Sequence, residues 1–362
     1  MRPGYGAGVV LTPWSRAAAA AVALCTLLPL AACSQDAPSG PPARTSDPGG
    51  TPSPESSAGP DQGPITLAFA GDINLEGRLA DGRIGGLRRD LAAADLSVVN
   101  LETAVTGRGV AADKQYVFRG PASALAGLKD AGIDVVSVAN NHGMDYGQTG
   151  LRDTLDAASA AGLPLIGAGL DEAAAFAPYR TTRKGQRLSV LAATQVLDEQ
   201  FKVTWAAGPH TPGLASAYHV ETLLAAVREA RATSDVVVVF LHWGVELQTC
   251  PAERATTLAQ QLSDAGADVV VGSHAHVLLG DGRLGNTYVD YGLGNFQFYN
   301  GSGPSAQTGV LTLTMQGRQT MKADWDPGVM RSGRPEPLTG AAREAALAQR
   351  EQRRACTGLT AP

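Results

Sequence analysis

Four of the six histidines in this chain fall in three short motifs, and each motif directly follows a run of apolar residues. The motifs are Asn140-Asn141-His142-Gly143, His242-Trp243-Gly244 and Gly272-Ser273-His274-Ala275-His276. The runs before them span residues 133–138, 236–241 and 268–271, and their length and composition predict buried strands. The imidazoles are therefore expected at strand carboxyl ends, the edge at which open α/β sheets place their binding sites.

From residue 65 onward, short apolar runs alternate with amphipathic stretches. Strands are predicted over residues 65–70, 96–99, 133–138, 164–166, 188–193, 236–241 and 268–271. Helices are predicted over residues 85–94, 121–131, 147–161, 219–232 and 252–265. Residues 287–290, 310–315 and 321–325 predict antiparallel strands that complete a sheet edge, and residues 194–218 predict a long loop over the site. The alternation predicts a layered α/β fold.

Length and charge narrow the possible classes of protein. The 362 residues are enough for one large hydrophobic core or two modest ones. The formal net charge of −5 gives no sign of the basic face that binding to nucleic acid requires. We therefore expect no nucleic acid among the partners.

The amino-terminal segment has the features of an export signal. An apolar run over residues 17–28 follows Arg2 and Arg16, and it is too short to span a bilayer comfortably. The sequence Leu30-Ala31-Ala32-Cys33 closes this run and resembles the bacterial lipoprotein box, in which cleavage precedes a cysteine that becomes lipid-modified. The alternative is an ordinary cleavage site with an incidental cysteine. The lipoprotein interpretation predicts an exported protein, anchored to the membrane through Cys33 on its extracytoplasmic face.

Composition divides the rest of the chain. Residues 34–64 hold eight prolines among Ser, Gly and Asp, which predicts a disordered linker. We expect a signal peptide over residues 1–33, this linker, a folded domain over 65–330 and a helical tail over 331–362. Once Cys25 is removed and Cys33 is acylated, Cys250 and Cys356 remain. An oxidising compartment favours a disulfide between them, and two unpaired thiols are the alternative.

Carboxylates follow the first two predicted strands, with Asp72 after one and Glu102 after the next. A single acidic residue in such a place is about as often only a helix cap. The strand ends taken together offer Asp72, Glu102, Asn141, His142, His242, His274 and His276. Nitrogen and oxygen ligands without thiolate suit Mn, Fe or Zn, and a bridging carboxylate would allow a centre of two divalent ions.

Six blocks of sequence resemble the signature blocks of the bacterial capsule-synthesis CapA family. They are Gly71-Asp72, Asn100-Leu101-Glu102, Asn140-Asn141-His142, His242-Trp243-Gly244-x-Glu246, Gly272-Ser273-His274-x-His276 and Gly292-Leu293-Gly294-Asn295-Phe296. That family is associated with poly-γ-glutamate, and its domain is similar to the calcineurin-like metallophosphoesterases. The resemblance implies a layered αββα sandwich and runs from about residue 65 to about residue 310.

The resemblance also implies roles for individual residues. Asp72 and His276 resemble ligands of a first metal, Glu102 stands near the bridging carboxylate, and Asn141, His242 and His274 resemble ligands of a second metal. His142 resembles the catalytic histidine that assists the leaving group. Two departures concern the first metal, because the phosphoesterases have histidine where Asn74 stands and Gly-Asp where Asn100-Leu101-Glu102 stands. This position is therefore expected to be weakened, altered or empty.

Hydrolysis is the natural reaction class for such a centre. Asn74, Glu246 and Asn295 are candidates for contact with substrate or for support of the ligands, and each is equally compatible with a structural role. Two functions follow. One is an envelope metallohydrolase that cleaves a phosphoester or an amide of an acidic polymer. The other is a non-catalytic component that binds, guides or anchors poly-γ-glutamate or a related anionic polymer, together with membrane synthase or export subunits.

Overall fold

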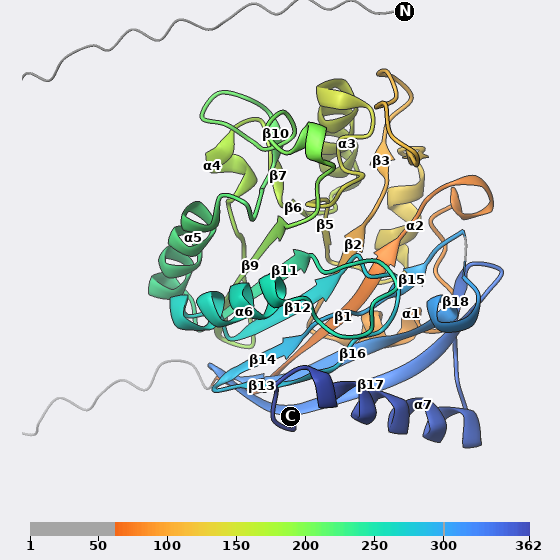
Figure 1. Ribbon diagram of the computed structural model, residues 1–362, viewed down its shortest axis with the longest axis vertical. Coiled ribbons are helices and arrows are strands. Elements are labelled where there is room, and N and C mark those ends of the chain that lie inside the picture. Colours follow the sequence, from red (N-terminus) through yellow and green to blue (C-terminus); the bar gives the residue numbers. More distant parts are fainter. Residues whose placement is uncertain (1–61, 300) are drawn as a thin grey trace, which may run out of the picture. The chain divides into compact units, whose positions relative to one another are not determined.

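A computed structural model describes residues 62–299 and 301–362 (Figure 1). The predicted signal peptide, Cys33 and nearly all of the predicted linker lie outside the described residues. In the described part of the chain, no helix is both long enough and apolar enough to cross a membrane.

The first sheet contains eight strands in the order β18-β17-β16-β1-β2-β5-β6, with β15 also paired to β1. Its parallel strands are β1 (Ile65–Ile73), β2 (Leu96–Leu101), β5 (Val135–Ser137), β6 (Leu165–Ile166) and β15 (Asn295–Gln297). Three antiparallel strands extend the sheet beyond β1, namely β16 (Gln307–Gln316), β17 (Gln319–Arg331) and β18 (Arg334–Pro337). The two antiparallel strands predicted near residues 310–315 and 321–325 are therefore confirmed as parts of β16 and β17.

The second sheet contains six strands in the order β13-β14-β12-β11-β9-β8. The strands are β8 (Tyr179–Arg183), β9 (Gln186–Thr194), β11 (Val236–His242), β12 (Val269–Ser273), β13 (Asp281–Leu284) and β14 (Thr287–Asp290). The strand predicted over residues 287–290 is β14, which pairs antiparallel with the edge strand β13 and, on its other side, pairs parallel with β12. Strand β13 was not predicted, since its residues Asp281-Gly282-Arg283-Leu284 carry little apolar signal.

Alternation along the strands packs the two sheets against each other. Along β11, the side chains of Val236, Val238 and Phe240 belong to the core between the sheets, which also contains residues of β1 and β2. Their neighbours Val237, Val239 and Leu241 belong to a separate core beneath helices. Because successive side chains of a strand point to opposite faces, one apolar strand can serve both layers.

Helices cover the outer face of each sheet (Figure 1). Helices α1 (Arg88–Ala93), α2 (Ala124–Asp130) and α3 (Gly147–Ala161) pack on the first sheet, and α5 (Val220–Thr233) and α6 (Glu253–Ala265) pack on the second. Helices α3 and α6 end at Gly162 and Gly266, whose left-handed φ values of 59° and 106° favour glycine. The predicted αββα sandwich is confirmed.

Short elements and the carboxyl terminus complete the described part. Strand β3 (Ala104–Val105) pairs with β4 (Arg119–Gly120), and β7 (Ala168–Gly169), followed by α4 (Glu172–Ala175), pairs with β10 (Gly213–Leu214). Strand β10 and the short turn Glu199–Phe201 lie within the segment predicted as a loop. Helix α7 (Gly340–Arg353) lies along β17 (Figure 1). Beyond it, Cys356 forms a disulfide with Cys250, with the Cα atoms 5.7 Å apart.

Candidate metal centre

The ends of parallel strands from both sheets bring polar side chains to one place. In the first sheet, Asp72 lies near the end of β1 and Glu102 follows β2. In the second sheet, His242 ends β11, and the turn after β12 carries His274 and His276. A bulge in the pairing of β1 with β2 falls between Ala70 and Asp72, and such a bulge changes the direction in which the strand aims its side chains.

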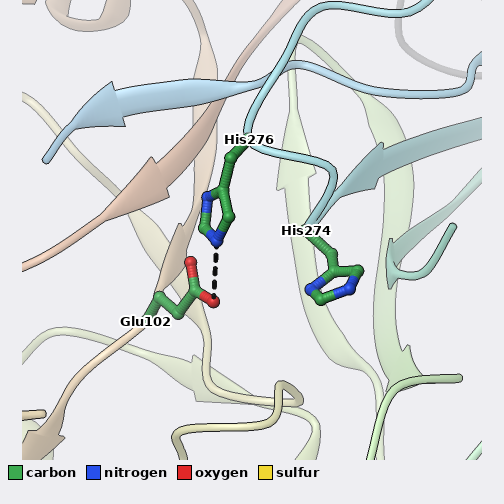
Figure 2. Close-up of side chains that lie close together, drawn as sticks. All are labelled: Glu102, His274 and His276. Carbon is green, nitrogen blue, oxygen red and sulfur yellow. Dashed lines mark ion pairs between the residues drawn. The ribbon is translucent and has the colours of Figure 1, made fainter. Parts of the chain in front are cut away.

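Glu102, His274 and His276 form the centre of this group (Figure 2). Each offers one ligand atom, and these atoms lie within 4.8 Å of one another. Figure 2 shows Glu102 and His276 pointing toward each other, with His276 Nε2 at 3.9 Å from Glu102 Oε1 and His274 on the same loop. His274 and His276 have φ values of 93° and 55°, which are uncommon for residues other than glycine and indicate a strained turn.

Three polar atoms in this group are buried and have no hydrogen-bond partner in the described residues. They are both carboxylate oxygens of Glu102 and the Nδ1 atom of His274. Burying such atoms without a partner is costly, and a cation is the ligand that can satisfy two carboxylate oxygens and an imidazole nitrogen together. The residues present therefore fit a divalent metal ion.

Asp72 is fully buried and is held by three neighbours. Its Oδ1 accepts a hydrogen bond from Asn100 Nδ2 at 2.8 Å, and its Oδ2 accepts one from the backbone N–H of His274 at 3.2 Å. His276 Nδ1 lies 3.4 Å from the same Oδ2. Burial alone would raise the pKa of Asp72, but the hydrogen bond to His276, the charges of His276 and His242, and Asn100 together lower it below its ordinary value.

His242 and Asn141 join the same cluster. His242 Nε2 lies 2.8 Å from Asn141 Oδ1 and 3.5 Å from Glu102 Oε1, while its Nδ1 lies 3.0 Å from Ser273 Oγ. The six predicted ligands, Asp72, Glu102, Asn141, His242, His274 and His276, thus lie together, although segments of up to two hundred residues separate them in sequence.

The two histidines of the strained turn have opposite electrostatic environments. Burial lowers the pKa of His274 well below its usual value, and His242, His276, His142 and Arg254 lower it further. Burial also opposes protonation of His276, but the charges of Glu102 and Asp72 outweigh it and raise the pKa of His276 to about 10. A proton on His276 thus offsets two buried carboxylates, which is the charge that a bound cation would supply instead.

His142 forms a hydrogen-bonded pair with Asp145, a carboxylate that was not predicted from the sequence. Its Nδ1 lies 2.6 Å from Asp145 Oδ2, and its ring stacks on Phe118 with centroids 3.9 Å apart. Asp145 also accepts the backbone N–H of Phe118 at 2.6 Å and forms an ion pair with Lys114 Nζ at 2.9 Å. These contacts fix the ring and assign the hydrogen to Nδ1, which leaves Nε2 for another partner.

The three candidate supporting residues lie in different environments. Asn295 Oδ1 is 2.8 Å from His276 Nδ1, so it orients the ring of a candidate metal ligand from the side opposite Glu102. Asn74 is buried, and its Oδ1 accepts the backbone N–H of Glu76 at 2.9 Å. Glu246 is exposed and lines a cavity that also reaches Asn141 and His274.

Four further residues that organise the site were not predicted from the sequence. Asn100 lies in the Asn100-Leu101-Glu102 motif and links Asp72 to His242, since the Asn100 amide nitrogen is 3.3 Å from His242 Nδ1. Asp145 stands three residues after His142, a spacing that allows contact across one turn. Ser273 precedes His274 and contacts His242. Lys114 lies in an irregular segment, and no periodicity or motif marks it.

The comparisons with known proteins agree with the motif resemblance. The family model described as bacterial capsule synthesis protein PGA_cap matches residues 66–300. The PGA biosynthesis protein CapA of Bacillus subtilis (strain 168) is 31% identical over 286 residues, which cover 76% of this chain and 74% of that relative. The capsule biosynthesis protein CapA of Bacillus anthracis is 31% identical over 234 residues, which cover 64% of this chain and 56% of that relative.

A comparison of folds found a crystal structure of a putative 5'-nucleotidase from Staphylococcus aureus. The match has a TM-score of 0.47 and 14% identity, and it covers 80% of this chain and 58% of that one. At this level of similarity we draw no conclusion from it about substrate or reaction. The family model and the Bacillus subtilis relative show that this chain belongs to the bacterial capsule synthesis family PGA_cap.

Proposed function

We propose that the protein acts in the biosynthesis of poly-γ-glutamate, or a related anionic capsule polymer, as a metal-dependent hydrolase of the cell envelope. Family membership and the names of the Bacillus relatives support a role in the synthesis of this polymer. The main support for a metal-dependent hydrolase is the set of buried potential ligand atoms on Glu102 and His274 that have no hydrogen-bond partner in the described residues. A chain that only needed a packed core at this position would have paired or replaced these groups.

Different residues around the centre would bind the metal, transfer a proton and orient a ligand. One or two divalent ions of Mn, Fe or Zn, held by Asp72, Glu102, Asn141, His242, His274 and His276, would activate water and polarise the bond under attack. Asp145 accepts the hydrogen on Nδ1 of His142, so that Nε2 is the atom that takes up a second proton and then gives it to the leaving group, while the Asp145 carboxylate balances the imidazolium charge. Asn295 and Asp72 contact His276 Nδ1 and so direct its Nε2 toward Glu102.

The first experiment measures metal content and turnover in the full-length chain. Elemental analysis is run on the wild type, on His274→Ala with His276→Ala, and on the control His210→Ala, whose histidine is exposed. Each protein is then assayed on γ-linked oligoglutamate and on a phosphodiester. We expect stoichiometric metal and cleavage of the oligoglutamate in the wild type and the control, and neither in the double variant. A wild type without metal or without turnover would overturn the proposal.

A second variant separates chemistry from metal binding. His142→Asn should keep the metal but lower kcat about 10²- to 10⁴-fold, because the proton donor is lost while the ligands remain. An unchanged kcat would remove His142 from the reaction.

One observation favours a second candidate function, a non-catalytic component that binds or anchors the polymer beside membrane synthase or export subunits. Asn74 stands where the resembled phosphoesterases have a ligating histidine, and its side-chain oxygen is already engaged by the backbone of Glu76. A protein that binds polyglutamate without cleaving it would support this function in place of the hydrolase.

We also propose that Cys33 anchors the protein to the membrane, on the strength of the sequence Leu30-Ala31-Ala32-Cys33. Cys33→Ser should move the protein from the membrane fraction to the soluble fraction. Retention of the variant in the membrane fraction would refute the anchor.

A further inference from the structure

A cavity of about 360 Å³ lies beside the metal centre. Asn141 and His274, two of the candidate ligands, form part of its wall. His274 is 5% exposed, and its Nδ1 has no hydrogen-bond partner in the described residues. The volume falls in the range of roughly 300–1,000 Å³ that is usual for small-ligand sites. The cavity therefore offers a place for the part of a substrate next to the bond that reacts.

Three charged residues line this cavity, namely Asp198, Glu246 and Arg254. The Asp198 charge is offset by Lys114, whose Nζ lies 3.5 Å from Asp198 Oδ2 and whose side chain is only 5% exposed. Lys114 also donates a hydrogen bond to the backbone carbonyl of Asn141, so this pair is built into the wall.

Glu246 and Arg254 differ from Asp198 in their lack of an ion-pair partner among the described residues. Within the described residues, neither of them forms an ion pair at 4.0 Å or less. Arg254 Nη2 donates a hydrogen bond to the carbonyl oxygen of Gly244 at 2.8 Å. This bond holds one side of the guanidinium and leaves the other N–H groups available. The cavity thus presents one uncompensated negative and one uncompensated positive charge beside His274.

We propose that this cavity binds the free amino-terminal residue of a γ-linked glutamate chain. This inference rests on the proposed function and names the part of the polymer that enters the site. Glu246 receives the α-ammonium group, Arg254 receives the α-carboxylate, and the γ-carbonyl lies toward His274. Only the terminal residue of such a chain carries an ammonium and a carboxylate on one carbon, which matches a site with one charge of each sign.

The same charges disfavour two other ligands. An inner segment of the polymer carries carboxylates but no ammonium, so Glu246 would repel it. A phosphate group has at least one negative charge and no positive charge, so Glu246 would repel it and only Arg254 would attract it. Hydrolysis at the expected position adds the hydroxyl of water to the γ-carbonyl carbon and a hydrogen to the leaving nitrogen. It releases one free glutamate and a chain shortened by one residue.

Binding of defined oligomers tests the proposal without relying on turnover. Calorimetry on the full-length protein compares γ-linked triglutamate with the same peptide acetylated at its amino terminus. We expect acetylation to weaken binding roughly tenfold or more, because it removes the positive charge that Glu246 recognises. Glu246→Gln should weaken binding of the free peptide by a similar factor and abolish the preference, and Arg254→Gln should weaken binding of both peptides.

The control is Glu221→Gln, which removes a carboxylate that is 86% exposed on α5. It should leave both affinities unchanged, and unchanged metal content in every variant excludes misfolding as the cause. Equal affinity for the free and acetylated peptides, or a Glu246→Gln variant that keeps the preference, would overturn the inference. If the protein cleaves oligoglutamate but binds the free and acetylated peptides equally, only this subsite is refuted. If the protein lacks metal or turnover but still prefers the free peptide, only the hydrolase is refuted.

Discussion

Two buried charged clusters in this protein differ in how their charges are balanced. One is the metal centre. The other, called here the α7 cluster, consists of Arg350 on α7 with Asp281, Tyr288, Asp290 and Trp325 beneath it. Arg350 Nη2 lies 2.7 Å from Asp290 Oδ2, its Nε lies 3.3 Å from Asp281 Oδ1, and its guanidinium lies 4.0 Å from the centre of the Trp325 ring.

The α7 cluster holds a permanently charged guanidinium, whereas the metal centre holds only imidazoles, among which a proton on His276 takes the place of a bound ion. The carboxylates of Asp281 and Asp290 both face Arg350, and Tyr288 donates its hydroxyl hydrogen to Asp281. In the metal centre, Asp72 and Glu102 face imidazoles, and neither carboxylate oxygen of Glu102 has a hydrogen-bond partner in the described residues. A closed cluster fastens elements of structure together, whereas an open set of ligands is suited to binding.

The largest expected effect tests the closed cluster. Arg350→Met should lower the free energy of unfolding by about 3–5 kcal/mol, because it leaves the buried Asp290 carboxylate without its cation and leaves Asp281 with only the Arg354 guanidinium at 3.8 Å. Burial already raises the pKa of Asp290 to about 6 while Arg350 is present. Urea denaturation measures the change, with Arg343→Met as the control. Arg343 is 45% exposed and 3.6 Å from Asp326, so its loss should cost less than about 1 kcal/mol. Equal costs for the two variants would contradict the comparison.

The next prediction tests the open cluster. Glu102→Gln should lower metal affinity about 100-fold or more, because it removes the charge of a central ligand. In chelator, however, its free energy of unfolding should stay within about 1 kcal/mol of the wild type, since a single proton on His276 faces two buried carboxylates and the substitution removes one of those two negative charges. Titration with metal and urea denaturation measure the two effects. A large loss of stability in chelator would show that Glu102 serves the fold.

A smaller effect is expected from a residue behind a ligand. Asn295→Ala should weaken metal binding about 10- to 100-fold, because His276 loses the acceptor that orients its ring. The same titration measures it, with the exposed Gln349→Ala as the control. If Asn295→Ala binds metal as tightly as Gln349→Ala, Asn295 does not support the centre.

The smallest effect concerns an intermediate case, the carboxylate pair of Asp90 and Asp326. Partial burial, followed by the hydrogen bond and charge of Asp326, raises the pKa of Asp90 to about 6. The ionised form is thus disfavoured in the folded state, and stability should fall as pH rises from about 4 to about 6. Asp90→Asn should therefore stabilise the protein by about 1 kcal/mol at pH 7, with no gain below pH 4. A gain that is the same at both pH values would refute this cause.

The layers of the fold could be predicted because their signals are local. Apolar runs such as residues 236–241 and periodic stretches such as 147–161 each carry their own pattern, and β11 and α3 appear at these places. The parallel pairing of β14 with β12 could not be predicted in this way, because the chain first passes through β13, a short polar strand with little apolar signal. The same holds for α7, whose attachment depends on Arg350 reaching carboxylates of the second sheet.

The candidate site divides along the same line. The sequence by itself determined which residue types stand at the strand ends, because a histidine or carboxylate directly after an apolar run is a local pattern in the amino-acid sequence. The tertiary structure decided which of them meet, that Asp145 and Lys114 support His142, and that Glu246 and Arg254 share one cavity beside His274. Contacts between residues far apart in sequence depend on how two twisted sheets pack, and no local pattern encodes that geometry.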